Sequence, residues 1–374
     1  MSEIAEIADP GLPAAHGGRV PLWTGVVPAL ALALLAAIGA GLIAKSGLVA
    51  LLAGAALLGA CVFAAVHHAE VLALRLGEPF GSILLAVAVT VIEVGLILSL
   101  ILSGADGVET VARDTIFSTV MIAVNGVLGL CLLLGGRRYG ETGFQLQGAA
   151  SALAVLGTLS VLTLVMPLLA ESVRGPTFSS AQLLFVALAA LFLYGVFVKE
   201  QTIGQRAYFL DLNPTPETHA PPTGRVAAAS LGLLILCLLA VVLLAKLLSY
   251  PLDAAVAAAG LPQAFVGVVV ATVVLLPESL AALKAAVANR LQTSINLTLG
   301  SAIASIGLTI PAVAAVTLLI DRPMALGLSP AKIALLVLTL IIGAITLGTG
   351  RTTVLQGAVH LVICGCFLLL AAVP

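Results

Sequence analysis

The sequence predicts an all-α integral membrane protein of about eleven transmembrane helices, with one N-terminal helix and two inverted five-helix repeats. Three observations lead to this fold class. Apolar residues make up 61% of the 374-residue chain and charged residues only 9%, whereas a soluble domain carries about 25% charged residues. The apolar residues form continuous runs of about 20 residues, long enough to cross a bilayer. The longest polar interruption lies near the middle of the chain.

The composition also excludes several classes of protein. Sixteen Lys and Arg residues against 17 Asp and Glu residues give a net charge of −1, so the chain lacks the positive excess of a nucleic-acid-binding protein. Strands of an outer-membrane barrel alternate apolar and polar residues, and these runs are continuously apolar. The five cysteines are scattered among apolar runs, which indicates small buried side chains and no disulfide framework.

Charges, Gly/Pro turns and polar clusters divide the chain into eleven candidate spans. The first 20 residues carry Glu3, Glu6 and Asp9 where a signal peptide would be basic, so the first span is expected to be retained. We place the spans at 25–44, 47–75, 80–104, 110–135, 147–170, 178–199, 226–249, 262–287, 293–320, 329–349 and 352–373.

The polar interruption predicts a linker between two halves. It contains four prolines and several charged residues, and five spans lie on each side of it once the first span is set apart. An odd number of spans in each half makes the halves opposite in orientation, as in inverted-repeat transporters. The expected units are an N-terminal tail with the first helix (1–44), the first repeat (45–199), the linker (200–225) and the second repeat (226–374).

The Lys and Arg residues of the loops predict the orientation. If the N-terminus is cytoplasmic, ten of these residues face the cytoplasm and six face the other side, which agrees with the positive-inside rule. We therefore expect a cytoplasmic N-terminus and linker and a periplasmic C-terminus, in a bacterial inner membrane.

Each half contains one carboxylate deep within an apolar run, Glu93 in the first and Glu278 in the second. A carboxylate at the bilayer centre costs at least about 2.5–3.5 kcal/mol, so two at matched places predict a shared site at the midplane. Two carboxylates can bind a metal cation together with other oxygens, or take up protons, because burial and mutual repulsion disfavour the ionised form. Alternatively, the two side chains only hold the helix bundle together.

Further oxygen ligands are expected from neighbouring positions. Thr90 lies one turn before Glu93, and Asn125 and Ser305 lie in polar stripes of the helices that follow the two carboxylates. These groups either face the site or join helices to one another. Pro277 precedes Glu278 and removes a helical hydrogen bond, which either frees carbonyls near Val273 and Val274 for a cation or only kinks the helix.

Three stretches resemble the cation/calcium exchanger superfamily, in particular its bacterial ChaA-type calcium/proton antiporters. They are HAEVLALRLGEPFGSILLAVAVTVIEVGLILSLILSG (68–104), RDTIFSTVMIAVNGVLGL (113–130) and LLPESLAALKAAVANRLQTSINLTLGSAIASIGLTIPAV (275–313). The resemblance implies eleven helices and cation export driven by proton influx. It also implies that Glu93 and Glu278 stand at the two essential carboxylate positions. Because His68 and Glu70 open the first stretch, it further suggests a proton-relay or regulatory role for them; read alone, they fit an interfacial helix end.

The chain departs from the family pattern next to both carboxylates. Many calcium/proton exchangers have Gly-Asn-x-x-Glu at both sites, and here the corresponding residues are Thr90 and Leu275 with no amide. Fewer side-chain oxygens put selectivity for calcium in question, and ChaA-type members are also linked to sodium and potassium exchange.

We therefore expect a secondary antiporter that exports Ca²⁺ in exchange for protons at Glu93 and Glu278, with Na⁺ and K⁺ as further candidate substrates. A monovalent Na⁺/H⁺ or K⁺/H⁺ antiporter is the alternative, and a passive cation channel is a remoter one. An enzyme is not expected, because the spans contain no nucleophile–base or metal-ligand set. The expected partners are inorganic cations, protons and membrane lipid; no resident cofactor is expected.

Overall fold

The chain folds into a bundle of long apolar helices. The computed structural model describes residues 20–44, 47–77, 80–101, 108–173, 175–212, 221–320 and 324–373. Its α-helices are α1 (Leu22–Gly39), α2 (Leu48–Leu76), α3 (Phe80–Ile101), α4 (Val111–Met121), α5 (Leu128–Tyr139), α6 (Leu146–Ser160), α7 (Met166–Leu169), α8 (Ser180–Lys199), α9 (Gly224–Ala258), α10 (Ala264–Val287), α11 (Leu291–Ala304), α12 (Ile310–Ile320), α13 (Pro330–Leu347) and α14 (Val354–Ala372).

Shorter elements connect and interrupt these helices. Two short strands pair antiparallel, with Thr142 opposite Thr352. Four π-turns continue helices, and they join α4 to α5, α6 to α7 and α11 to α12 and extend α8. The bounds are β1 (Thr142–Gly143), β2 (Arg351–Thr352), the 3-10 turns η1 (Val108–Thr110) and η5 (Arg206–Phe209), and the π-turns η2 (Ile122–Val127), η3 (Val161–Val165), η4 (Glu200–Gly204) and η6 (Ser305–Thr309).

Every expected span corresponds to a helical segment, and the described chain contains eleven helices long and apolar enough to cross a membrane. Their ends differ from expectation by a few residues, except in α9. That helix passes through Pro251 and ends at Ala258, nine residues after the expected end at 249. A proline removes only one helical hydrogen bond, and the alanine-rich residues after it favour helix strongly.

The expected linker begins later than predicted. Its first residues continue α8 as η4, and the next turn, η5, packs back onto the bundle. Residues 213–220 of the expected linker lie outside the described residues. We call the face that carries this segment the linker side; the α2–α3, α5–α6, α10–α11 and α13–α14 turns lie on it, because successive spans alternate in direction.

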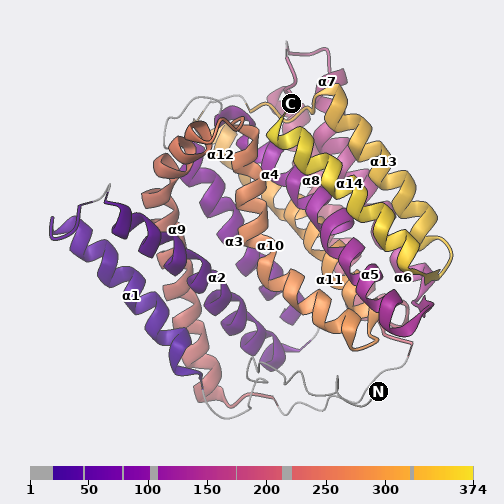
Figure 1. Ribbon diagram of the computed structural model, residues 1–374, viewed down its shortest axis with the longest axis horizontal. Coiled ribbons are helices and arrows are strands. Elements are labelled where there is room, and N and C mark those ends of the chain that lie inside the picture. The colour runs from indigo at the N-terminus through magenta and orange to yellow at the C-terminus, as the bar shows by residue number, and fades with distance from the viewer. Residues whose placement is uncertain are drawn as a thin grey trace.

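The helices form two packed groups (Figure 1). The first core cluster joins α1, α2, α3 and α9, and the second joins α4–α8 and α11–α14. The helix α10 contributes to both clusters, with Val270 and Val274 in the first and Val268 and Leu275 in the second. The helices α3 and α10, which carry the two predicted carboxylates, therefore lie along the boundary between the groups.

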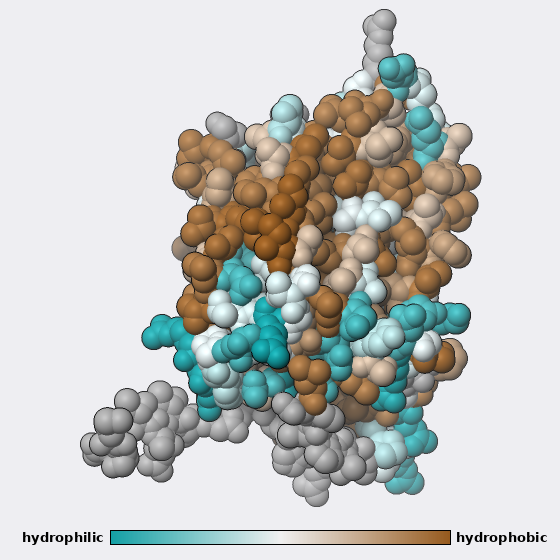
Figure 2. Space-filling view, turned by 90° about the vertical axis from the view of Figure 1, so that its right-hand side faces the viewer, coloured by the Kyte–Doolittle hydropathy of each residue, from teal (hydrophilic) through white to brown (hydrophobic). Residues whose placement is uncertain are grey.

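The outer surface matches a membrane environment. Figure 2 shows the face built by the later helices, where apolar side chains cover a broad band and hydrophilic ones gather below it. Large hydrophobic side chains exposed on the helices include Phe185, Phe192, Ile345 and Val362. Exposed apolar surface of this extent is not stable in water, so the described chain is that of a multi-pass membrane protein.

Candidate functional site

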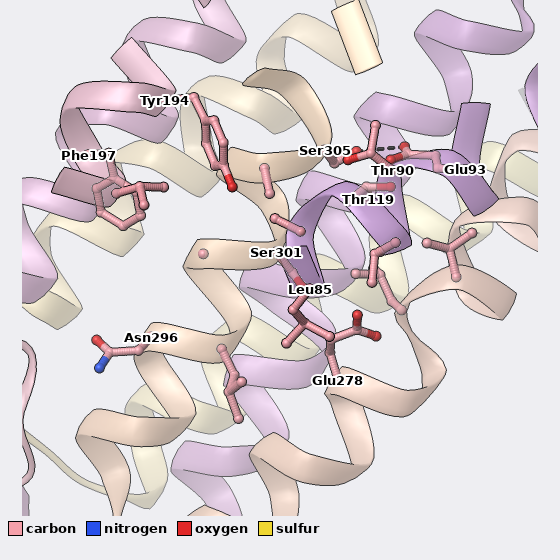
Figure 3. Close-up of a pocket in the computed structure, with 18 of the residues that line it drawn as sticks. Leu85, Thr90, Glu93, Thr119, Tyr194, Phe197, Glu278, Asn296, Ser301 and Ser305 are labelled. Atoms are coloured by element: carbon pink, nitrogen blue, oxygen red, sulfur yellow. Dashed lines mark hydrogen bonds between the residues drawn. The ribbon is translucent and has the colours of Figure 1, made fainter. Parts of the chain in front are cut away.

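Glu93 is buried midway along α3, where two hydroxyl groups hold its carboxylate. Its side chain is 1% exposed. Ser305 Oγ donates to Oε1 at 2.6 Å and Thr309 Oγ1 donates to Oε2 at 2.9 Å (Figure 3). Both hydroxyls come from η6 in the second half of the chain. The site is therefore built from both halves, as expected for inverted repeats.

The π-turn η6 explains why two hydroxyls reach one carboxylate. It widens the helix between α11 and α12, and Ser305 and Thr309 open and close it. Such π-turns inside α-helices occur frequently at functional sites. Gly307, between them, lies against α8; a Cβ there would come within 2.6 Å of the Tyr194 Cβ. The glycine lets α8 approach η6 closely while the hydroxyls face α3.

Glu278 lies in α10 directly after Pro277, and its surroundings differ from those of Glu93. Its Oε2 is buried and has no hydrogen-bond partner among the described residues. A small cavity beside it is lined by Ala123 and Val127 of the π-turn η2 and by residues of α10 and α11, among them Leu275, Leu297, Ser279, Thr298 and Ser301. The first-half π-turn thus presents apolar side chains to Glu278, where the second-half π-turn presents hydroxyls to Glu93. The two carboxyl groups are not equivalent.

Glu93 and Glu278 line one cavity of about 150 Å³. Thr90, Thr119 and Ser301 add hydroxyl groups to its wall (Figure 3). Other lining residues come from the linker-side parts of the surrounding helices. Examples are Leu85 of α3, Phe197 of α8, Gln201 of η4 and Asn296 of α11. The cavity therefore extends from the middle of the bundle toward the linker side.

On the other side of Glu93 the bundle is closed. Ile97, one turn further along α3, packs with Ala112 and Val313 in a buried cluster, and Leu98 and Met324 cover it. The exposed fractions of Ile97, Ala112 and Val313 are 0%, 0% and 2%. The carboxylate pair is thus approached from the linker side and sealed by apolar packing from the opposite side.

A segment of the linker holds the linker-side rim of this cavity. Asp211 accepts hydrogen bonds from the backbone N–H and the hydroxyl of Thr293, at 3.0 and 2.5 Å, and pairs with Arg290 at 3.2 Å. Asn296 donates to the Phe209 carbonyl at 2.6 Å. These contacts fix the first turns of α11, and with them the wall that carries Ser301 and Ser305.

The structure brings most of the predicted ligand positions to the cavity. Thr90, Ser305 and Val274 line it, together with the two glutamates. Val273 instead packs against the first core cluster. Pro277 is buried within α10, which continues from Ala264 to Val287 without a break.

Asn125 lies away from the cavity. Its amide donates to Thr339 Oγ1 at 2.9 Å, and its Oδ1 lies 2.9 Å from Nδ1 of His360. The other ring nitrogen of His360 is 3.2 Å from Thr346 Oγ1. Asn125 therefore joins η2 to α13 and α14 in a buried polar network and does not face Glu278. The reason is the π-turn, whose extra residue rotates the following side chains away from α-helical spacing.

His68 and Glu70 lie on different faces of α2, because residues two apart are about 200° apart on a helix. His68 is 0% exposed, and neither ring nitrogen has a hydrogen-bond partner among the described residues. Glu70 is exposed and lines a second cavity, which it shares with His67. Of the two histidines, it is therefore His67, and not His68, that is placed to exchange a proton with Glu70.

Several residues of the site were not singled out from the sequence. Thr309, the second donor to Glu93, lies four residues after Ser305 in the same polar stripe, and this spacing is the signal for it. Tertiary packing brings three further residues to the cavity wall, and no sequence pattern indicates them: Thr119, Tyr194 and Asn296. Among the described residues, no three His, Cys, Asp or Glu side chains converge on one metal position. The oxygens near the pair are therefore two carboxylates and several hydroxyls.

A membrane bundle of two inverted halves, with one carboxylate from each half in a cavity at mid-depth, defines a secondary transporter of the inverted-repeat type. Comparison with known proteins agrees. The family model described as sodium/calcium exchanger protein matches residues 46–202 and 229–373. The chain belongs to this family of exchangers and antiporters.

Two curated relatives and one solved structure are informative. The chain is 56% identical over 362 residues to y4hA of Sinorhizobium fredii, described as an ionic transporter, with 96% of this chain and 98% of the relative covered. It is 36% identical over 312 residues to the sodium-potassium/proton antiporter ChaA of Escherichia coli, covering 82% and 84%. The structure of native YfkE aligns with a TM-score of 0.71 at 14% identity, covering 94% of this chain and 100% of that one.

Proposed function

We propose that the chain is a cation/proton antiporter in which Glu93 and Glu278 alternately hold a cation and protons. The observation that carries this proposal is that both carboxyl groups line one cavity, although they come from opposite halves of the chain. Carboxylates and hydroxyls are the oxygen ligands that hard metal cations prefer. The same carboxylates can accept protons instead, so cation and protons compete for one site.

The coupling follows from the cost of moving charge through the membrane. With the site open to the linker side, two ionised carboxyls hold a cation. After the bundle rearranges, protons arriving from the opposite side displace the cation, and the protonated site returns. An empty site with two ionised carboxyls carries an uncompensated charge, which is expensive in a low-dielectric interior. Only a site that holds a cation or protons therefore changes its access from one side to the other. This restriction couples cation export to proton import.

We propose Ca²⁺ as the exported cation. Two carboxylates balance the charge of a divalent cation, and the hydroxyls of Thr90, Thr119 and Ser301 supply further oxygens from the cavity wall. The YfkE protein, which shares the fold, is described as a Ca²⁺/H⁺ antiporter.

Sodium or potassium is the second candidate, and three observations favour it. The residues beside the pair, Thr90 and Leu275, provide no amide oxygen. Of the two amide residues in the cavity wall, Gln201 and Asn296, Asn296 is already bonded to Phe209 and Gln292. In addition, the 36% identical relative is described as a sodium-potassium/proton antiporter. A site with fewer oxygens suits a monovalent cation better.

We place the protein in a bacterial inner membrane with the linker side toward the cytoplasm. The excess of Lys and Arg on the linker side supports this orientation. In this placement the C-terminus lies in the periplasm, and the cavity described above faces the cytoplasm.

The decisive experiment measures proton flux from acid-loaded inverted membrane vesicles after Ca²⁺, Na⁺ or K⁺ is added separately. We expect cation-dependent proton release that Glu93→Gln and Glu278→Gln each reduce to background, because each removes a carboxylate that both ions need. Glu141→Gln, at an exposed residue far from the cavity, is the control. Response to Ca²⁺ identifies the first candidate, and response only to Na⁺ or K⁺ identifies the second.

Two results would contradict the proposal. Wild-type proton release in either glutamine variant means that the pair is not the exchange site. Cation flux that continues after the proton gradient is collapsed, and that follows the cation potential alone, means a passive channel.

A further inference from the structure

A second cavity, of about 230 Å³, lies between α1, α2 and α10. Its wall contains Trp23 of α1, His67 and Glu70 of α2, and Pro277, Ala281 and Lys284 of α10. A water molecule needs only about 10–15 Å³ of such space, so the cavity has room for a chain of water molecules. It lies toward the linker side, because Trp23 begins α1 while Glu70 and Lys284 lie near the linker-side ends of their helices.

This second cavity and the carboxylate cavity lie against two faces of the same helix. Val274, Leu275 and Glu278 of α10 face the carboxylate cavity. Pro277 and Ala281, immediately before and three residues after Glu278, face the second one. Glu70 also lies close enough to Glu278 to act on it electrostatically, as Glu93 does from the other side. Glu278 therefore lines the carboxylate cavity, and its neighbour Pro277 lines the second one.

The chemistry of the second cavity suits protons and not metal cations. A hard cation needs several oxygen ligands, and among the named lining residues only Glu70 provides side-chain oxygens. The Lys284 ammonium on the facing wall repels a cation. By contrast, carboxylate and imidazole groups are the usual carriers of protons in proteins. The ionisable groups near Glu70 are His67 on its own helix and Lys284 and Glu278 on α10; His68 points to another face of α2, and Trp23 of α1 is neutral.

We propose that protons travel between Glu278 and the linker side through this second cavity by way of Glu70, while the cation uses the carboxylate cavity. This inference rests on the proposed antiport. In each step one proton moves: the Glu278 carboxyl gives its proton through water to the Glu70 carboxylate. Glu70 then passes it to His67 or to water on the linker side. Separate routes let the proton leave Glu278 while a cation approaches through the other cavity.

The test separates proton-coupled exchange from exchange that involves no proton. The protein is reconstituted in vesicles, and the cation used is the one that drives proton release by the wild-type protein. One assay measures exchange of this cation for protons. The other measures exchange of the cation for its own labelled isotope. We expect Glu70→Gln to slow cation/proton exchange by roughly tenfold or more and to leave isotope exchange unchanged. Glu70→Asp, which keeps the carboxyl group, should retain most of the proton-coupled rate. Glu141→Gln is the matched control.

Retained isotope exchange also demonstrates that the variant is folded. If Glu70→Gln does not assemble in the membrane, Ala281→Leu replaces it as the test variant, because it narrows the same cavity without changing a charge. It should likewise lose cation/proton exchange and keep isotope exchange. A wild-type cation/proton rate in Glu70→Gln, or an equal loss in both assays, would overturn the separate route. A wild-type protein that shows neither kind of exchange would instead count against the proposed antiport itself.

Discussion

The two carboxyl groups of the cavity are held in different ways. Ser305 and Thr309 donate to both oxygens of Glu93, whereas one oxygen of Glu278 is buried without a partner among the described residues. The π-turn η2 places the apolar Ala123 and Val127 beside Glu278, whereas the π-turn η6 places two hydroxyls beside Glu93. Glu93 is consequently a fixed part of the cavity wall, and in the proposed antiport Glu278 is the group with capacity left for an incoming ion.

Removing a hydroxyl from Glu93 should weaken cation binding. A hydrogen bond to a charged group contributes about 1.5–3 kcal/mol, so Ser305→Ala or Thr309→Val should raise the cation concentration for half-maximal exchange by roughly tenfold or more. The measurement is the cation dependence of proton release in inverted vesicles. Thr158→Val is the control, because that exposed hydroxyl bonds only to Ala154 of its own helix. Unchanged cation dependence in both site variants would mean that these hydroxyls do not position the carboxylate.

At the scale of elements, charged groups fix the starts of α4 and α11, the two helices that lead into the π-turns η2 and η6. Asp211 holds the first turn of α11 on the linker side. On the opposite side, Asp114 in the first turn of α4 pairs with Arg113 at 3.0 Å and with Lys332 of α13 at 2.6 Å. The Asp114 side chain is 3% exposed, and a carboxylate in the first turn of a helix also interacts favourably with the helix dipole. The cluster joins the first and second halves of the chain.

Neutralising Asp114 should destabilise the fold more than removing either of its partners. Breaking a buried ion pair costs about 3–5 kcal/mol; because Lys332 is partly exposed, we expect roughly 2–4 kcal/mol for Asp114→Asn. The change in Lys332→Met should be smaller, since Arg113 still pairs with the carboxylate. Thermal unfolding of the purified protein in detergent compares the two variants. An equal shift of the midpoint temperature in both, or none in Asp114→Asn, would argue against this cluster as a main link between the halves.

For the whole molecule, access to the carboxylate pair is one-sided. The cavity runs from Glu93 and Glu278 toward the linker side, and the cluster of Ile97, Ala112 and Val313 closes the opposite side. Alternating access requires a second arrangement, in which this apolar cluster separates and the linker-side wall closes. The boundary between the two packed groups of helices is where such a rearrangement can occur, because α3 and α10 lie along it.

Thiol labelling can detect this one-sided access. In a background of Cys364→Ser and Cys366→Ser, Ser301→Cys should react with a membrane-impermeant thiol reagent added to the linker side, because Ser301 lines the cavity. The transported cation should slow the reaction. The matched variant Ser99→Cys, on α3 beyond Glu93 and 7% exposed, should stay unlabelled from the opposite side under the same conditions. Labelling at Ser99→Cys with none at Ser301→Cys would mean that the protein opens the other way.

Sequence reasoning reached the parts of the site that depend on periodicity and depth. Glu93, Glu278 and Thr90 follow from their positions within apolar spans, and Ser305 follows from a polar stripe at helical spacing. Asn125 was assigned to the wrong surroundings, because the π-turn η2 changes the spacing on which the assignment depended. The closeness of Glu70 to Glu278 could not be inferred either, since it depends on how α2 packs against α10.

By itself, the sequence determined the membrane class, the eleven spans and the two matched carboxylates, because hydrophobicity, span length and buried charge are local properties of the chain. Only the tertiary structure decided which hydroxyls hold Glu93, which groups leave Glu278 without a full set of partners, and which side of the cavity is open. These features depend on contacts between different helices, such as the one between Glu93 and Ser305, which lie 212 residues apart in sequence. Helix packing brings such side chains together, and no local pattern records it.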